Sequence, residues 1–158
     1  MEFVCCFIKE QYFIDHPSFI KMLDPGNTAK QSRRSYLCLK ITADGNDYYI
    51  PLRNNLGAEV RAYGRIGHSV PSSTRPSAGL DYRYSLIVKD PQYIDIPASQ
   101  RIPNTQFDKI ASDYSIIEEE FTKYLCGFKK ALRKQRVQRE ALYRESSLIN
   151  FIDELTEN

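Results

Sequence analysis

The chain has few of the residues that build zinc and redox sites. Its four cysteines form no Cys-x-x-Cys pair, and its only two histidines, His16 and His68, lie far apart in the sequence. Because a structural zinc site needs closely spaced cysteine and histidine ligands, we expect no zinc. The cysteines are expected to be free, buried thiols in a reducing compartment.

Long apolar runs and common catalytic motifs are also missing. No apolar run approaches 18 residues and no secretory signal pattern is present, which favours a cytoplasmic protein without a membrane contact. No glycine-rich phosphate loop, catalytic triad or carboxylate pair stands out. With 158 residues, 42% of them hydrophobic and 27% charged, the chain is expected to form a single domain, residues 1–158.

Positive charge is concentrated in the middle of the chain. The formal net charge is only +2, but residues 30–101 hold eleven Lys or Arg against six Asp or Glu. The flanking segments hold more acidic than basic residues. A basic central block favours an anionic partner, with RNA or DNA favoured over a membrane surface.

A β-hairpin over residues 34–55 is the clearest structural pattern. Two runs rich in β-forming residues flank Asp44-Gly45, a dipeptide suited to a tight type I′ turn because Gly tolerates positive φ. A two-residue turn there sets the register, and side-chain alternation then gathers apolar residues on one face. The predicted facing pairs on that face are Ile41 with Tyr48, Leu39 with Ile50, and Leu37 with Leu52.

The other face of this hairpin carries cationic side chains. Arg34, Tyr36 and Lys40 are predicted there on the first strand, and Arg53 and Asn55 on the second. Near the open end of the hairpin, two guanidinium groups can make bidentate contacts to one phosphate. The alternative is that this face is an ordinary solvated sheet surface.

The rest of the sequence predicts strands first and helices later. An irregular, basic segment is expected at residues 54–79. From residue 103 onward, apolar residues recur at helical spacing, with a break allowed at Gly127, and a last helix is expected over residues 148–155. We therefore predict an α+β fold: a compact, twisted, mostly antiparallel β-sheet with surrounding helices and a helical C-terminal half. Further short strands are expected at residues 2–8, 81–88 and 93–96.

Several short stretches come in an order that resembles a known family. They are Arg34-Ser35-Tyr36-Leu37 entering the hairpin, Tyr48-Tyr49-Ile50-Pro51-Leu52 closing it, Ile102-Pro103-Asn104-Thr105 opening the long helix, and the terminal Ser147-Leu148-Ile149-Asn150-Phe151. Together with the opening strand, they resemble the ToxN/AbiQ family, the endoribonuclease toxins of type III toxin–antitoxin systems. The similarity spans most of the chain, and residues 56–78 match least.

The resemblance implies a sequence-selective endoribonuclease that needs no metal and no cofactor. Its implied partners are a repeat RNA antitoxin, which it processes and which inhibits it, and cellular or phage RNA substrates. A closed protein–RNA assembly with several copies of each is implied, in phage defence by abortive infection. No DNA partner is expected.

The resemblance also implies where the active site lies. In the family, a basic residue just before the first hairpin strand belongs to the site, and Arg34 holds that position here. The family's second strand typically ends in Pro-Leu-Thr-Ser, with a lysine two residues after the serine. In this chain the Pro-Leu is kept, but Arg53 and Asn54 follow it, and Leu56 stands in place of the lysine.

Cleaving RNA without a metal requires removing a proton from a 2′-OH and protonating the 5′-oxygen. His68 lies in the basic segment, and histidine has an unperturbed pKa of about 6.5, which suits either task. The alternative is an ordinary surface histidine, and Tyr36 is then the next choice for proton transfer. The products are expected to carry 2′,3′-cyclic phosphate and 5′-hydroxyl ends. The predicted catalytic residues are Arg34, Arg53, Asn54 and His68.

RNA-binding residues are expected on the hairpin face, in the basic segment and along a basic helix at residues 129–139. Such a helix can grip phosphates through counterion release, or it can be a solvated helix face. Two other functions stay open: a non-catalytic RNA-binding module that uses Arg34, Tyr36 and Arg53, and a protein-interaction domain in the helical half. The predicted RNA-binding residues are Lys30, Arg33, Tyr36, Asn55, Arg61, Arg65, Ser69, Arg75, Lys130, Arg133 and Arg136.

Overall fold

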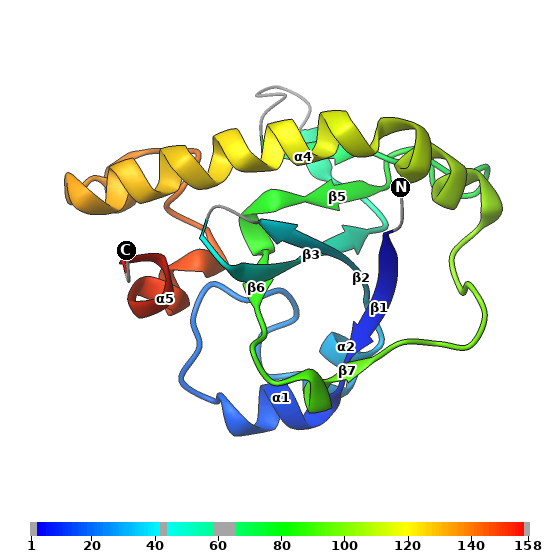
Figure 1. The fold of residues 1–158 in the computed structure, drawn as a ribbon, viewed down its shortest axis with the longest axis horizontal. Coiled ribbons are helices and arrows are strands. Elements are labelled where there is room, and N and C mark those ends of the chain that lie inside the picture. Colours follow the sequence, from blue (N-terminus) through cyan, green and yellow to red (C-terminus); the bar gives the residue numbers. More distant parts are fainter. Residues whose placement is uncertain (1–2, 42–43, 59–65, 157–158) are drawn as a thin grey trace.

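Helices lie on both sides of an open β-sheet in the computed structural model, which describes residues 3–41, 44–58 and 66–156 (Figure 1). The predicted α+β class is confirmed, with a long helix in the C-terminal half. The described strands are β1 (Val4–Ile8), β2 (Ser35–Ile41), β3 (Asn46–Arg53), β4 (Gly67–Ser69), β5 (Gly79–Asp81), β6 (Leu86–Ile87) and β7 (Ile94–Asp95). The described helices named below are α1 (Glu10–Asp15), α2 (Thr28–Ser32), α4 (Asn104–Arg133) and α5 (Ile152–Thr156).

The β2–β3 hairpin forms the middle of the sheet. The strand order is β4-β5-β3-β2-β1-β7, with β6 pairing with the other part of β3, and all of these pairings are antiparallel. The hairpin is therefore the element to which both the N-terminal strand and the later strands add.

The predicted register of this hairpin is wrong by two residues. Leu37 pairs with Ile50 and Leu39 with Tyr48, and four residues rather than two connect the strands. We attribute the difference in register to Asp44, which binds side chains outside the turn. Its carboxylate accepts hydrogen bonds from the Tyr48 hydroxyl at 2.5 Å and from Lys129 of α4 at 3.0 Å.

The predicted apolar face is confirmed, because a shift of two residues preserves the alternation. Leu37, Leu39, Tyr48 and Ile50 are at most 1% exposed, and α4 packs over this face. The ring of Tyr48 meets that of Phe121 on α4 at a centroid distance of 5.2 Å. Leu52 is partly buried, and the side chain of Ile41 lies outside the described part of the structure.

The prediction of an accessible cationic face on the other side is wrong for the middle of the hairpin. Tyr36 and Tyr49 there are only 3% and 6% exposed. Figure 1 shows α1, α2 and α5 on the side of the sheet away from α4. α1 is tied to the sheet by Tyr12, whose hydroxyl donates to the backbone oxygen of Ile87 at 2.9 Å. The sheet therefore has apolar packing on both faces.

Helix α4 runs without a break from Asn104 to Arg133, about 45 Å at the usual rise per residue. The break allowed for at Gly127 does not occur. A Cβ atom at Gly127 would collide with the hydroxyl of the buried Tyr143. The glycine is thus explained by the close approach of the following chain rather than by an interruption of the helix.

The predicted strand at residues 81–88 is interrupted. A 3₁₀ turn, Tyr82–Tyr84, separates β5 from β6, because the Asp81 side chain accepts the backbone N–H of Arg83 at 3.1 Å and so caps this turn. Near the end of the chain, Ser146 caps a 3₁₀ turn, Ser147–Phe151, that leads into α5.

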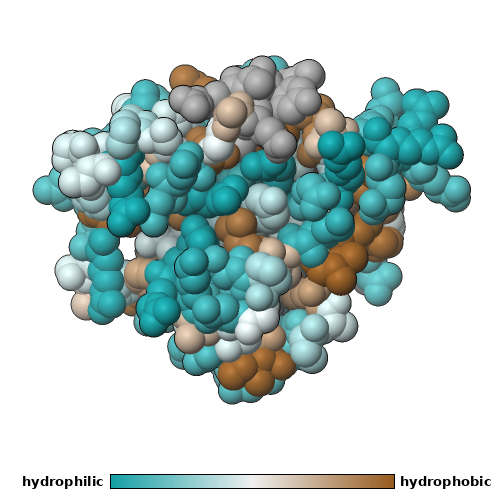
Figure 2. Space-filling model, turned by 180° about the vertical axis from the view of Figure 1, so that it is seen from behind, coloured by the Kyte–Doolittle hydropathy of each residue, from teal (hydrophilic) through white to brown (hydrophobic). Residues whose placement is uncertain are grey.

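Hydrophilic side chains cover most of the face shown in Figure 2, and the apolar side chains on it form small patches. Within the described ranges, no helix combines the length and the apolar composition that a membrane span requires. Large apolar side chains that are exposed in these ranges are Ile14, Ile20, Ile96, Ile116 and Ile152.

The packing face of α4 can be tested with two neighbouring isoleucines. Ile117 is 0% exposed and Ile116 is 50% exposed. We expect Ile117→Ala to lower the free energy of unfolding by about 2–5 kcal/mol, because it leaves a cavity, and Ile116→Ala to change it by less than about 1 kcal/mol. Urea unfolding of both variants measures this difference. Equal losses would contradict the packing of α4 described above.

Candidate functional site

A cavity of about 310 Å³ lies at the open end of the β2–β3 hairpin. We call it the basic pocket, because five of its lining residues are Lys or Arg and none of the described ones is acidic. It is built where the start of β2 and the end of β3 meet the turn at residues 72–75 and the beginning of α4. Its lining residues are Lys30, Arg33, Arg34, Ser35, Leu52, Asn54, Ser72, Thr74, Arg75, Arg101, Ile102, Pro103 and Gln106.

Short-range hydrogen bonds position the walls of this pocket. Asn27 caps α2 by accepting a hydrogen bond from the backbone N–H of Lys30 at 3.0 Å. This cap fixes the start of the helix that contains Lys30 and that ends next to Arg33. Ser72 and Arg75 exchange two backbone hydrogen bonds of 3.1 Å and so close a tight turn. The basic residues therefore project from constrained turns and a helix end rather than from the sheet surface.

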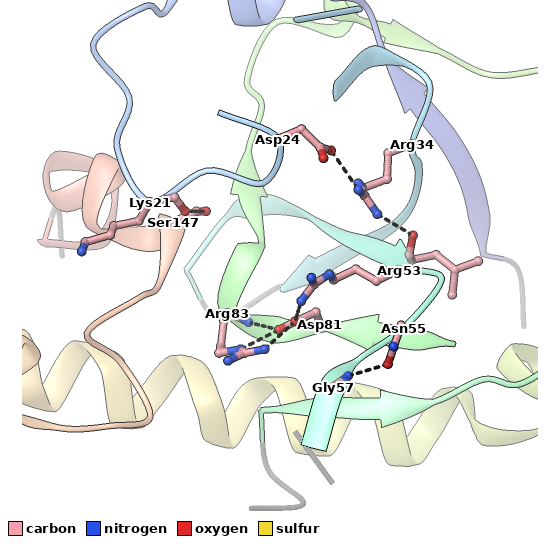
Figure 3. Close-up of polar contacts among 10 residues, drawn as sticks. Lys21, Asp24, Arg34, Arg53, Asn55, Gly57, Asp81, Arg83 and Ser147 are labelled. Carbon is pink, nitrogen blue, oxygen red and sulfur yellow. Dashed lines mark hydrogen bonds and ion pairs between the residues drawn. The ribbon is translucent and has the colours of Figure 1, made fainter. Parts of the chain in front are cut away.

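The side chain of Arg34 is held at the back of the pocket by Asp24 (Figure 3). Its Nη2 atom donates to the Asp24 carboxylate at 2.8 Å and its Nη1 atom to the backbone oxygen of Leu52 at 3.4 Å. Partial burial acts to raise the pKa of Asp24, but the hydrogen bonds and charges of Arg34 and Lys30 outweigh it and lower that pKa. The carboxylate is thus ionised at neutral pH and fixes the guanidinium group.

Three other arginines of the pocket have no carboxylate partner among the described residues. Arg33, Arg75 and Arg101 are exposed, and within the part of the chain that the structure describes none of them forms an ion pair. Among the described residues, only Asp24 pairs with pocket cations, Lys30 at 3.3 Å and Arg34 at 2.8 Å, and its single negative charge offsets one of their five positive charges. The pocket therefore presents strong positive potential to an anion of the size of a phosphate group.

Arg53 does not line the basic pocket. Figure 3 shows it directed toward Asp81 rather than toward Arg34. Its Nη1 atom donates to Asp81 at 2.9 Å, and Arg83 donates to the same carboxylate at 3.0 Å. Because Asp81 is 0% exposed, this pair belongs to the interior of the sheet. The predicted convergence of Arg34 and Arg53 on one phosphate is not what the structure shows.

His68 also lies outside the pocket, and both of its ring nitrogens are occupied. Nδ1 lies 2.8 Å from Glu120 and Nε2 lies 2.8 Å from Asp113, both on α4. The Tyr82 hydroxyl donates to the same Glu120 at 2.7 Å. The hydrogen bonds from His68 and from Lys109 lower the pKa of Asp113. This arrangement attaches β4 to α4, and it replaces the predicted meeting of His68 with Arg34 and Asn54.

The predicted RNA-binding residues separate into distinct groups. Lys30, Arg33 and Arg75 line the basic pocket together with Arg34 and Asn54. None of the other described members lines this pocket.

Tyr36 is buried, and burial raises the pKa of its hydroxyl, so it is not an accessible contact or proton acceptor. Asn55 is exposed and accepts the backbone N–H of Gly57 at 2.9 Å. Ser69 is exposed on β4, and Arg61 and Arg65 lie outside the described residues.

A second group of cations sits at the far end of α4. Lys130, Arg133 and Arg136 are exposed, and we call them the distal basic patch. Arg133 is 27 residues after Gln106, which places it about 40 Å from the basic pocket along the helix. The two groups of cations therefore cannot contact the same phosphate.

Several residues of the site were missed from the sequence. Arg101 and Gln106 line the pocket, and Asp24 orients Arg34. All three lie outside the basic segment of residues 54–79, so no local pattern grouped them with it. Arg101 stands directly before the Ile102-Pro103 stretch that opens α4, which is the one local signal that it lies near the helix start. Leu56, at the position of the family's lysine, is only 5% exposed and contributes to the core.

The fold and the pocket together define an α+β protein with a strongly cationic site at the end of its central hairpin. Among the described residues, no group of three or more His, Cys, Asp or Glu side chains is placed to hold a metal ion. Comparisons found no protein family, curated protein or solved structure that matches the chain.

The role of His68 gives a direct test. We expect His68→Ala to lower the free energy of unfolding by about 1–3 kcal/mol, because two carboxylates on α4 lose their contact with the imidazole. We expect the rate of RNA cleavage, the activity that the resemblance implies, to change by no more than a few-fold. Thermal unfolding and single-turnover cleavage measure the two effects. A rate loss of about 10²–10⁴ without a change in stability would restore the proton-transfer role.

Proposed function

We propose that this protein is a metal-independent endoribonuclease that binds an RNA phosphate in the basic pocket. The observation that carries the proposal is the set of five cations around one cavity, three of them without a carboxylate partner among the described residues. The resemblance to the ToxN/AbiQ family adds support, since Arg34 holds the family's basic position directly before β2. Both arguments point to the open end of the hairpin.

The proposed reaction is an attack within the RNA strand. The 2′-oxygen forms a bond to the adjacent phosphorus and the bond from phosphorus to the 5′-oxygen breaks. The proton of the 2′-hydroxyl is lost, and a proton is gained by the leaving oxygen. The products are therefore a 2′,3′-cyclic phosphate and a 5′-hydroxyl. Water is not the nucleophile.

Charge stabilisation is the contribution that the pocket makes to this reaction. The non-bridging oxygens gain negative charge in the transition state, and a guanidinium group binds two such oxygens in a bidentate way. Arg34 is fixed by Asp24 before the substrate arrives, which reduces the reorganisation needed during the reaction. Asn54, exposed at the end of β3, can donate its amide to the same oxygens.

Proton transfer is proposed to involve solvent. None of the described lining residues is a histidine, an aspartate or a glutamate, the side chains that usually act as acid or base near neutral pH. Hydroxide or water then accepts the proton of the 2′-hydroxyl. Such a reaction accelerates steadily with pH between about pH 6 and 8, instead of showing the bell-shaped profile of a two-histidine enzyme.

We further propose that the protein is a toxin, and that a repeat RNA both inhibits it and is cleaved by it. The basic pocket would receive the cleavable linkage, and the distal basic patch offers a second phosphate-binding surface on the same subunit. A closed assembly with several copies of protein and RNA would use both surfaces. Cellular or phage RNA would be the substrate once the repeat RNA is removed.

A non-catalytic RNA-binding protein is the second candidate. The absence of a conventional acid or base among the described lining residues favours it. The surface first predicted for it is retained only in part, because Tyr36 is buried and Arg53 binds the buried Asp81, whereas Arg34 lines the basic pocket. Binding would instead use the basic pocket, and cleavage of RNA distinguishes the two candidates.

Cleavage in the presence of EDTA tests the proposed reaction. We expect the purified protein to cut a defined single-stranded RNA with EDTA present and to leave 2′,3′-cyclic phosphate ends. We expect Arg34→Ala to slow the single-turnover rate by about 10²–10³, the usual effect of removing one donor to a developing negative charge. Arg144→Ala, at an exposed arginine outside both groups of cations, serves as the matched control and should keep the wild-type rate. Salt-dependent binding without any cleavage would select the second candidate.

The salt dependence of binding tests the assignment of the pocket cations. Each phosphate contact that is lost should reduce the slope of log K against log salt concentration by roughly 0.7–0.9. For an RNA short enough to occupy only the basic pocket, we expect this reduction for Arg33→Ala and Arg75→Ala but not for Arg136→Ala. Fluorescence anisotropy titrations at several salt concentrations measure it. The same slope in all three variants would rule out binding through the pocket.

A further inference from the structure

A second cavity opens directly beside the basic pocket. It measures about 250 Å³ and shares Ser35, Arg101 and Ile102 with the basic pocket. We call it the aromatic pocket. It lies between β1 and the segment that leads from β7 to α4. The two cavities are thus neighbouring compartments that meet at Arg101.

Three phenylalanines form the walls of the aromatic pocket. Phe3 directly precedes β1, Phe7 lies within β1, and Phe107 comes from the first turn of α4. The rings of Phe3 and Phe107 lie 4.9 Å apart at an angle of 32°, and all three side chains are partly exposed. Ring surface that is incompletely covered is available to a flat ligand.

Arg101 joins the aromatic wall to the cationic wall. Its guanidinium carbon lies 5.8 Å from the centre of the Phe7 ring, within the range of a cation–π contact. The side chain has no carboxylate partner in the described part of the chain. One face of its guanidinium is thus beside an aromatic ring, while its N–H groups remain available to a phosphate in the basic pocket.

Polar atoms at the rim of the aromatic pocket can form hydrogen bonds with the edge of a ligand. The Gln100 amide nitrogen donates at 3.0 Å to both the Ile102 backbone oxygen and the Asn104 side chain, which fixes the carboxamide. Its oxygen has no hydrogen-bond partner among the described residues. Deeper in the pocket, burial raises the pKa of Cys5 to about 11, so this thiol is neutral and contributes to an apolar wall.

We propose that the aromatic pocket binds one unstacked base of a single-stranded RNA whose neighbouring phosphate occupies the basic pocket. This inference rests on the proposed function and names its substrate class. Bases in a duplex are covered on both faces, whereas an extruded base can stack on aromatic side chains and on an arginine plane. The volume is just below the range of roughly 300–1,000 Å³ typical of pockets for drug-sized ligands, which suits one base.

Continuity with the cationic cavity favours a nucleotide over an apolar peptide as the occupant. An apolar side chain would fill the aromatic pocket but leave Arg33, Arg75 and Arg101, which pair with no carboxylate among the described residues, without an anion. A nucleotide supplies a planar aromatic base and a phosphate one sugar apart. That pairing reproduces the adjacency of Phe7, Arg101 and Arg34 across the two cavities.

The test uses single-stranded RNA with 2′-O-methyl groups, which cannot be cleaved, so that binding is measured independently of catalysis. A series of oligonucleotides is made in which one position at a time lacks its base. For the wild-type protein we expect one position at which the missing base weakens binding by about 10- to 100-fold. Phe7→Ala should bind the complete RNA more weakly by a similar factor and should no longer respond to the missing base.

Two further variants separate lost stacking from lost folding. Phe7→Leu keeps apolar volume without a ring and should behave like Phe7→Ala, whereas Phe7→Tyr keeps the ring and should behave like the wild type. Equal affinity of the wild type for every oligonucleotide in the series, with normal salt dependence, overturns the base pocket and leaves the proposed RNA binding intact. Failure to bind any RNA overturns both. A duplex that binds as tightly as the single strand also overturns the base pocket.

Discussion

The buried carboxylate of Asp81 is the constraint on which the open end of the sheet depends. It is 0% exposed and binds Arg53 of β3 and Arg83 of the following 3₁₀ turn. A buried carboxylate without partners is costly, and removing one partner of such a pair commonly costs about 3–5 kcal/mol. The pairing therefore joins β3 to β5 and provides a fixed frame for the basic pocket. Arg53, which seemed from its position to be a phosphate ligand, is part of that frame.

The elements set by local patterns could be predicted from the sequence. The alternation in residues 34–55 and the helical spacing after residue 103 depend on neighbours in the chain, and both elements are present. The register could not be predicted, because Asp44 is engaged by Lys129, 85 residues later. The burial of Tyr36 could not be predicted either, since the helices on its side of the sheet, α1, α2 and α5, come from both ends of the chain.

The site was predictable only in part, because some of its residues follow local sequence patterns whereas others depend on contacts with distant residues. Lys30, Arg33, Arg34, Asn54 and Arg75 were expected to bind RNA or catalyse its cleavage, and all of them line one pocket. A sequence shows where cations are but not which carboxylates reach them. The partners of Arg53 and His68 lie 28 to 52 residues away, and these contacts turn two expected site residues into structural ones. Arg101 was missed because no other cation stands near it in the sequence.

The unbroken course of α4 has a consequence for how the protein engages long polymers. Because α4 is continuous past Gly127, the basic pocket and the distal basic patch lie about 40 Å apart along the helix. Under the proposed function, this separation would make the molecule bivalent with a defined reach. A ligand with two sites at the matching separation can gain about 10²–10⁴ in avidity from the second contact, and one with another spacing gains nothing. The helix would then select RNA by the length of its repeat as well as by its bases.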